Sequence, residues 1–432
     1  MADLFNEPAF WMLLLFLGPL LCSVPISVSL GCAACFLLWK WDLGIMMLSY
    51  NFYAGIYKFP LLAIPFFILA GVIMEKAGIA ERIIRLINEL VGSVTGGLAI
   101  ATVAVATFWG AVSGSGPATV AALGLVLIPG MVKAGYDKAF ATSVVSVSSG
   151  LAIIIPPSII FIVYCDIMPQ VSIGALFAAG ILPGIVVALA LMIVVRLLSA
   201  RAGYRGTPRT PGELGRAFRN AFWGLVTPLI ILGGIYGGVF TPTEAAAVAV
   251  FYGLFIGFFI YRTLTLKILL DILISSLQGS AVVMFVVTCA GLYSWVGDTI
   301  GFIPKIGNIL LNISDNPWVV LLTINVMLFF AGMILEAIAI MYVFMPVLLP
   351  VVAHFGWDPL WFGVVATVNM AIGQVTPPVA VNLFVGANIS GLRIEEIAKP
   401  AIPQVAAVIV ALALISLFPA ISTFIPKMMG MY

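Results

Sequence analysis

Serine, glycine and proline residues are concentrated in the stretch GAVSGSGPATVAALG, which covers residues 110–124. Gly114 and Gly116 allow backbone conformations that other residues avoid. Pro117 suits the first turn of a helix, where its missing N–H group is not needed. We therefore expect an unwound segment that leads into a helix beginning near Pro117.

Such a segment offers two kinds of ligand. Its backbone carbonyls and the hydroxyls of Ser113, Ser115 and Thr119 are hard oxygen ligands suited to a sodium ion. The free N–H groups at the start of the new helix suit a carboxylate. Small-residue helix packing is the alternative explanation, but it accounts only for the glycines and not for a proline beside a cluster of hydroxyls.

Two Pro-Pro pairs, Pro156-Pro157 and Pro377-Pro378, predict further breaks. A proline in a helix removes a hydrogen-bond donor and clashes with the carbonyl four residues earlier. Two in succession should open the helix and leave carbonyls unpaired; a simple kink is the alternative. Polar side chains near each pair can satisfy those carbonyls or bind an ion. The neighbours are Ser146, Ser148, Ser149, Gly150 and Ser158 at the first pair, and Asn369, Gly373, Gln374, Thr376 and Asn382 at the second.

Carboxylates occur at two positions near membrane depth, Glu75 and Glu336. Ionisable groups at that depth are costly and often functional. Each can equally mark the end of a hairpin at the water boundary, so both roles stay open. Asp166 and Asp298 are predicted to end spans.

The stretch VFTPTEAAAVAVFYG, residues 239–253, contains a helix start. Thr241 and Glu244 fit a capping box, and Pro242 would occupy the first helical position. We favour a structural role for these residues over a role in binding.

Cysteine and histidine residues do not suggest a transition-metal site or another cofactor. His354 is the only histidine, and Cys32 and Cys35 lie in an apolar run without a histidine or an acidic neighbour. A zinc site needs four ligands and a supporting shell. We expect these cysteines to be small packing residues of a helix.

The elements that position these residues are predicted to be membrane-spanning helices. Of the 432 residues 63% are hydrophobic and 8% are charged, whereas a soluble domain carries about 25% charged residues. A water-soluble fold is therefore excluded, and a net charge of +2 gives no indication of nucleic acid. Several charge-free runs exceed the roughly 20 residues that a spanning helix needs, and we predict an all-α polytopic membrane protein of about ten or more spans. These runs are 9–39, 90–132, 139–165, 167–195, 272–297, 359–392 and 400–426.

The chain is predicted to consist of two repeats. Residues 67–79 resemble residues 329–340, matching Glu75 with Glu336, and the two Pro-Pro pairs lie in similar surroundings. The matched glutamates are 261 residues apart (75 to 336) and the proline pairs 221 (156 to 377), so we expect an insertion of 40 residues in the first half. Duplicated halves with helix breakers at corresponding places are typical of secondary transporters, whose sites lie near the membrane midplane.

The predicted division is a first half over residues 1–195, a basic linker over 196–219 and a second half over 220–432. Loops rich in Lys and Arg stay in the cytoplasm, which is where we place the linker. Residues 75–92 have the pattern of an amphipathic helix along the membrane surface, although an ordinary surface connector fits equally. The arginines of the linker are Arg196, Arg201, Arg205, Arg209, Arg216 and Arg219.

These motifs together resemble one known family. GAVSGSGPATVAALG, IPFFILAG (64–71), VFTPTEAAAVAV and NMAIGQVTPPVAVNLFV (369–385) look like the large membrane subunit of the tripartite ATP-independent periplasmic (TRAP) transporters. The resemblance runs from about Pro25 to beyond Pro400. One departure is Ala380, where the family often has glycine, and this puts the tightness of the turn there in doubt.

The resemblance implies an inverted-repeat, elevator-type transporter in the cytoplasmic (inner) membrane of a bacterium or archaeon, with discontinuous helices and two re-entrant hairpins. It implies two protein partners: a soluble periplasmic substrate-binding protein and a small four-helix membrane subunit. Sodium ions would be the coupling ions, and the substrate would be an organic acid such as a dicarboxylate, sialic acid or another sugar acid.

Carried over to this sequence, the resemblance implies two sets of site residues. The sodium set is Ser113, Gly114, Ser115, Gly116, Thr119, Gly373, Thr376 and Pro377. The substrate set is Ser149, Gly150, Pro156, Pro157, Ser158, Asn369, Gln374 and Asn382.

Three alternatives to a TRAP subunit stay open. A stand-alone sodium/carboxylate symporter would need neither partner, and a channel would show no stoichiometric link between sodium and substrate flux. A membrane-embedded enzyme would need a nucleophile with a base or a metal cluster, and one histidine without a paired His/Asp/Glu motif argues against it.

Overall fold

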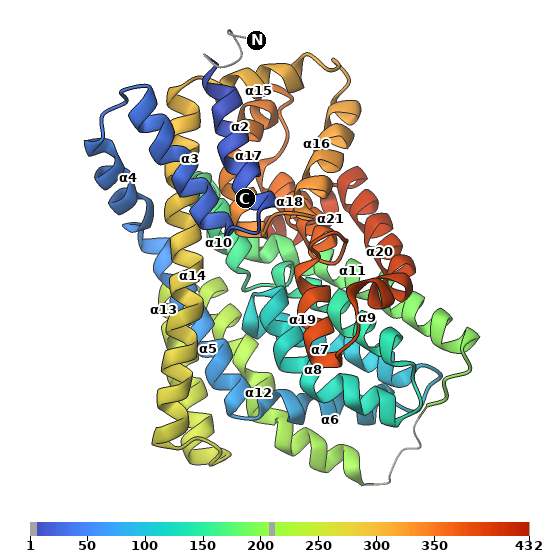
Figure 1. Cartoon of the computed structure of the whole chain (residues 1–432). Coiled ribbons are helices and arrows are strands. Elements are labelled where there is room, and N and C mark those ends of the chain that lie inside the picture. The colour runs from blue at the N-terminus through green and yellow to red at the C-terminus, as the bar shows by residue number, and fades with distance from the viewer. Residues whose placement is uncertain (1–6, 207–211, 432) are drawn as a thin grey trace.

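The computed structural model describes residues 7–206 and 212–431, and this part of the chain folds into helices without a strand (Figure 1). Arg209 of the predicted basic linker lies outside the described residues. The helix α11 (Ile173–Arg201) extends into the predicted linker, and α12 (Glu213–Tyr236) begins before the linker's predicted end.

Eight of the described helices are long and apolar enough to cross a membrane by length and composition. Glycine and proline breaks divide several of the charge-free runs into shorter apolar helices of 10–17 residues, which this length criterion leaves out. The eight are Phe59–Lys76, Gly116–Lys133, Ile173–Arg201, Glu213–Tyr236, Pro242–Ile260, Leu266–Thr299, Ala337–His354 and Ile394–Leu417.

Helices of the two halves follow one another in the same order. The first half contains α2 (Pro8–Leu21), α3 (Ile26–Lys40), α4 (Met46–Ile56), η1 (Phe59–Leu62), α5 (Ala63–Lys76), α6 (Ile79–Val91), α7 (Gly97–Ser113), α8 (Gly116–Lys133), α9 (Lys138–Ser148), η2 (Ser149–Ile153), α10 (Ile159–Ile167) and α11. The second contains α12, α13 (Pro242–Phe255), η3 (Ile256–Ile260), α14 (Leu266–Thr299), α15 (Phe302–Leu311), α16 (Pro317–Gly332), α17 (Ala337–His354), α18 (Pro359–Gly373), α19 (Val381–Ser390), α20 (Ile394–Leu417) and α21 (Ala420–Met428).

A single offset relates these two series. The helices α8 and α17 begin at residues 116 and 337, and α11 and α20 begin at 173 and 394, a difference of 221 in both cases. At this offset the long helix α14 corresponds to α4, η1 and α5 together. The predicted insertion of 40 residues is therefore wrong, and the counterpart of Glu336 is Ser115 rather than Glu75. The sequence match around Glu75 was compositional, because Ala-Gly pairs recur wherever membrane helices pack closely.

The two halves of the chain begin at opposite ends of the molecule. The short amphipathic helix α6 and the start of α12 lie at the bottom of the view, whereas α15 and α16 lie at the top (Figure 1). The hairpin of α7 and α8 follows α6, and the hairpin of α16 and α17 follows α15. Opposed hairpins of this kind are typical of inverted-repeat transporters.

Contacts divide the helices into two groups. We call α2–α5 with η1 and α12–α14 with η3 the outer group, because α3, α4 and α5 pack on α14, α2 packs on α3, and α13 packs on α5 and α12. We call α7–α11 with η2 and α16–α21 the inner body. The helix α6 packs on α12 and α7, and α15 packs on α14 and α17, so each connects the two groups.

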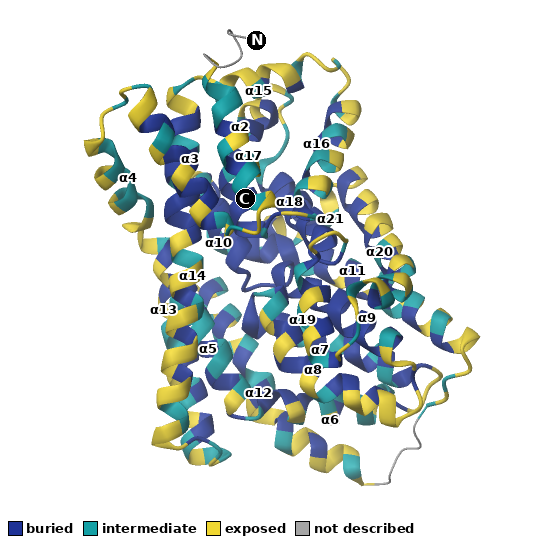
Figure 2. Ribbon diagram, viewed as in Figure 1, coloured by how far each residue is buried: buried dark blue, intermediate teal, exposed yellow. Residues whose placement is uncertain are grey.

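Burial follows this division. Side chains around the first break of the inner body are buried, whereas large apolar side chains are exposed on outward faces such as that of α14 (Figure 2). Lipid accepts such exposed apolar surface, because the hydrocarbon core offers nothing better to bury it against.

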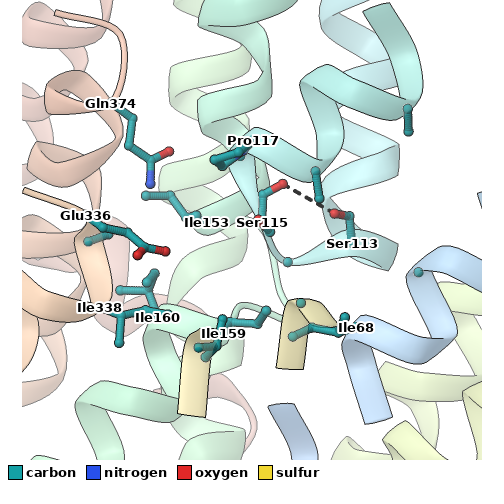
Figure 3. A pocket seen from close by; sticks show the side chains of 18 of the residues that line it. Ile68, Ser113, Ser115, Pro117, Ile153, Ile159, Ile160, Glu336, Ile338 and Gln374 are labelled. Carbon is teal, nitrogen blue, oxygen red and sulfur yellow. Dashed lines mark hydrogen bonds between the residues drawn. The ribbon is translucent and has the colours of Figure 1, made fainter. Parts of the chain in front are cut away.

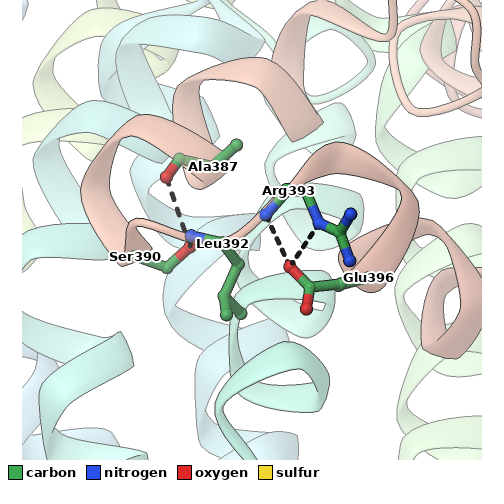
Figure 4. Close-up of polar contacts among 5 residues, drawn as sticks. All are labelled: Ala387, Ser390, Leu392, Arg393 and Glu396. Atoms are coloured by element: carbon green, nitrogen blue, oxygen red, sulfur yellow. Dashed lines mark hydrogen bonds and ion pairs between the residues drawn. The ribbon is translucent and has the colours of Figure 1, made fainter.

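Helix ends are fixed by local capping. Thr241 and Glu244 form the predicted capping box at the start of α13, with Pro242 at its first position. Between α19 and α20, the backbone N–H of Arg393 donates to Glu396 at 2.8 Å, and Ser390 closes the preceding turn (Figure 4). Such caps satisfy N–H groups that a helix start leaves without partners.

Candidate functional site

The tip of the first hairpin is unwound, as the sequence predicts. The helix α7 ends at Ser113, and α8 begins at Gly116 with Ser115 as its N-cap. Gly114 has φ +62°, and a Cβ atom there would lie 2.9 Å from the carbonyl oxygen of Pro157. Only glycine combines this backbone conformation with so close an approach. The hairpin tip is thus seated on the first Pro-Pro break.

That first break is buried and largely satisfied by its own side chains. The Pro156-Pro157 peptide bond is cis, and the helix resumes only at Ile159, the first residue of α10. Ser158 donates to the carbonyl of Ile153 at 2.6 Å, and Ser149 donates to the carbonyl of Val145 at 2.8 Å. Both hydroxyl hydrogens are therefore committed to the backbone, which leaves only oxygen lone pairs for a ligand.

The second break lies between α18 and α19, and the Pro377-Pro378 peptide bond is also cis. Pro377 and Pro378 are exposed, whereas the first pair is buried. Thr376 donates to the carbonyl of Ile372 at 2.8 Å. Ala380 takes φ +48°, so the turn keeps the left-handed conformation although the residue is not glycine. Gly373 lies against Gly332, at the end of α16.

A cavity of about 180 Å³ lies where the two hairpin tips meet the outer group (Figure 3). Ser113 and Ser115 approach it from one side, and Glu336 and Gln374 approach it from the other. None of the described residues that line it is Lys, Arg or His. Lining residues from the break and from the outer group are Ile153, Ile159 and Ile160, and Ile68, Gly71, Val72, Glu75, Gly279 and Val283.

Two buried side-chain amides meet at the first turn of α8, next to this cavity. The oxygens Thr119 Oγ1, Gln374 Oε1 and Asn382 Oδ1 have no partner within the described structure. A Cβ atom at Gly116 would lie 2.5 Å from Gln374 Oε1 and 2.9 Å from Asn382 Oδ1, so the first turn of α8 touches both amides. Leaving such a group unsatisfied costs about 1–3 kcal/mol. A cation supplies what these acceptors lack, so the donor set fits sodium.

Five of the sixteen predicted site residues line the cavity. The sodium set from Ser113 to Gly116 lines the cavity, as does Gln374 from the substrate set. Asn369 lies elsewhere: its Nδ2 donates to the carbonyl and the Oδ1 of Asn325, and both residues line an apolar groove among α16, α18 and α20. Gly150 packs against the carbonyl of Ala371 and is not a lining residue.

Two carboxylates line the cavity, although the predicted site did not include them. Glu336 is the N-cap residue of α17 without a side-chain cap, and Glu75 lies near the end of α5 beside Lys76, whose Nζ is 3.0 Å from its Oε1. The sequence feature that could have predicted both residues as part of the site is a charged residue within an apolar run. The described residues hold no group of three or more His, Cys, Asp and Glu side chains that could bind a transition metal.

Comparison with known proteins gives a consistent result. Residues 12–421 match the family described as "Tripartite ATP-independent periplasmic transporter, DctM component". The isethionate TRAP transporter permease protein DctMQ of Oleidesulfovibrio alaskensis is 40% identical over 94% of this chain, which spans only 64% of that relative's length. The C4-dicarboxylate TRAP transporter large permease protein DctM of Pseudomonas aeruginosa is 39% identical, with 94% of this chain and 95% of the relative covered. The sialic acid large permease protein SiaM of Vibrio cholerae is 36% identical, with 95% and 97% covered.

Proposed function

Because this chain belongs to the DctM component family of TRAP transporters, we propose that it is the subunit that moves an organic acid across the inner membrane in symport with sodium. The family is one of transporter permeases, and the chain has the apolar helices of a multi-pass membrane protein. The sodium coupling, the substrate class, the partners and the movement are proposals.

The observation that carries the sodium proposal is the position of two buried amide oxygens, Gln374 Oε1 and Asn382 Oδ1, which lack a hydrogen-bond partner and lie against Gly116 in the first turn of α8. Thr119, Gln374 and Asn382 come from three helical segments, and a cation bound among them would hold α8 against the second break. Sodium binding would thereby order the hairpin tips before the substrate enters. Affinity for the acid would then depend on sodium, which is the thermodynamic requirement for coupling.

The proposed substrate is a small organic anion. Relatives are named for isethionate, C4-dicarboxylates and sialic acid, all of which carry an acidic group. The cavity lacks a cationic side chain among its described lining residues. The start of α8 and the bound sodium would therefore provide the positive potential that the acid needs.

The proposed partners are a periplasmic substrate-binding protein and a small four-helix membrane subunit. The word "tripartite" in the family description is consistent with two further components. One relative, DctMQ, is longer than this chain, which covers 64% of it. The basic segment around α11 and α12 would face the cytoplasm, so the end of the molecule at α15 would face the periplasm.

The proposed movement is of the elevator type. The inner body carries both hairpins and both breaks, whereas the outer group contributes only one wall of the cavity. Sliding of the inner body along α5 and α14 would carry the site from one face to the other, with α6 and α15 as the connecting arms. Rigid-body movement of one helix bundle against another is the usual form of alternating access, and here the site would move with the inner body.

Uptake into proteoliposomes tests this proposal. The chain and its small subunit would be reconstituted, and labelled organic acids would be offered with and without an inward sodium gradient and the candidate binding protein. Uptake that needs both supports the tripartite symporter. Sodium-dependent uptake without the binding protein would instead establish a stand-alone symporter, and uptake that ignores sodium would contradict the proposal.

A further inference from the structure

A buried carboxylate joins the two helix groups at a place that the cavity does not use. The side chain of Asp166, near the end of α10, is only 2% exposed. Its Oδ2 accepts from Lys58 Nζ at 2.9 Å and from the hydroxyl of Tyr342 at 2.7 Å. Lys58, which immediately precedes η1, is 42% exposed, and Tyr342 in α17 is buried.

This cluster lies between the cavity and the end of the molecule at α15. Ile159, in the first turn of α10, lines the cavity, and Asp166 lies seven residues farther along (159 to 166), about 10 Å at 1.5 Å per residue. Tyr342 lies one helical turn beyond Ile338, which also lines the cavity. Glu75, at the far end of α5, lines the cavity toward α6. The ion pair therefore stands on the side opposite to α6.

The two bonds of Asp166 differ in what they connect. Tyr342 and Asp166 both belong to the inner body, in which α10 packs on α17. Lys58 belongs to the outer group, because η1 continues directly into α5 and packs on α13. A displacement of the inner body would therefore break the bond to Lys58 and keep the bond to Tyr342.

We propose that Lys58 and Asp166 form a latch that holds the inner body in the position seen here, closed toward the α15 end. This rests on the movement proposed above. Leaving a carboxylate buried without its cation costs free energy. Each outward displacement of the inner body therefore requires that free energy. The hydroxyl of Tyr342 lowers it by keeping one hydrogen bond on Asp166 throughout. Asp166 is thus a positioning residue for the inner body rather than a ligand of the substrate.

Thiol labelling in membranes tests the latch independently of sodium and substrate. A reporter cysteine replaces Ile160, which lines the cavity, in a variant whose native cysteines at 22, 32, 35, 165 and 289 are replaced by alanine. A membrane-impermeant maleimide is added to right-side-out vesicles that carry the full complex. Lys58→Met and Asp166→Asn should each raise the labelling rate about two- to five-fold, the factor expected for an ion pair with one exposed partner.

The control is Arg216→Met, which removes an exposed ion pair with Glu213 inside α12 of the outer group and should leave labelling unchanged. The exchange K58D/D166K should restore the rate of the parent, because it forms the ion pair again with its charges reversed. Unchanged labelling in both single variants, or an equal rise in the control, would overturn the latch. If Asp166→Asn does not accumulate, Lys58→Met decides alone, because its half-exposed site admits water. A lack of sodium-dependent uptake would contradict the proposed function. The labelling rates of the variants could still be compared, because they need neither sodium nor substrate.

Discussion

At the scale of single residues, the cavity is lined by two carboxylates, Glu75 and Glu336, and lies beside buried oxygens that lack hydrogen-bond donors. Gly116 touches the amides of Gln374 and Asn382, and Thr119 lies within the next turn of α8. Their donor-less oxygens would be destabilising in an empty core. The sodium ion proposed above would satisfy them.

The Ser115 hydroxyl gives the most direct residue-level prediction. Ser115 lines the cavity and makes no capping bond to α8. Ser115→Ala should raise the sodium concentration for half-maximal uptake about ten-fold, the effect of losing one bond to a charged group. Thr376→Ala should act in the same direction. The control is Ser172→Ala, at an exposed N-cap of α11 that also makes no side-chain cap. Sodium dependence that is unchanged in both variants would remove these hydroxyls from the ion site.

Gly116 allows a second test within one helix. Gly116→Ala would place a methyl group 2.5 Å from Gln374 Oε1, whereas Gly130→Ala in the same helix would meet nothing within 4 Å. We expect the first change to abolish sodium-dependent uptake and to destabilise the protein by about 1–3 kcal/mol. The second should leave both properties near the parent values. Equal thermal stability and equal uptake for the two variants would show that α8 does not contact the second break.

The sequence predicted part of this site. Residues 113–116 were predicted because glycine, serine and proline have strong backbone preferences that need no tertiary information. The distance of Asn369 from the cavity was not predictable, because its position one turn before the break says nothing about which neighbouring helix its side chain faces. The partnership of Gly116 with Asn382 joins two segments far apart in the sequence, and no local pattern reveals it.

At the scale of elements, the breaks were predictable and their pairing was not. Both Pro-Pro pairs end a helix, as expected from the loss of backbone donors. The relation between the halves was misjudged at Glu75, because a match of a few small residues is weak information. The helix bounds settle the relation between the halves. The first residues of α8 and α17 are 221 positions apart, and so are those of α11 and α20.

The start of α13 lies in one of the motifs that resemble the family, but its residues form a helix cap and not a binding site. Thr241→Ala removes the cap that accepts from the N–H of Glu244 at 3.3 Å. We expect the melting temperature to fall by about 2 °C while half-maximal sodium stays unchanged. Thr323→Ala, on an exposed face of α16, is the control for loss of a hydroxyl. A changed sodium dependence in Thr241→Ala alone would assign this motif to the ion site.

At the scale of the whole molecule, composition alone predicted a polytopic all-helical membrane protein. It did not predict how the helices divide into an outer group and an inner body, since that depends on which faces pack together. Figure 2 shows the result, with a buried interior around the first break and exposed apolar faces outside.

Orientation is a prediction at this scale. A cysteine at Ala202, the exposed C-cap residue of α11, should react with an impermeant maleimide only in inside-out vesicles, because a basic segment stays in the cytoplasm. A cysteine at Asn312, at the end of α15, should react only in right-side-out vesicles. Both would be placed in the variant without native cysteines. Reaction of both positions from the same face would contradict the inverted arrangement of the two halves.

The central claim, coupling of sodium to an organic acid, is tested most directly by measuring both fluxes in the same proteoliposomes. Radioactive sodium and a labelled acid identified by uptake would be followed together, with the binding protein and the small subunit present. We predict that the acid triggers sodium entry and that the ratio of the two fluxes is the same at every substrate concentration. Acid uptake without accompanying sodium entry, or sodium entry that ignores the acid, would contradict the account.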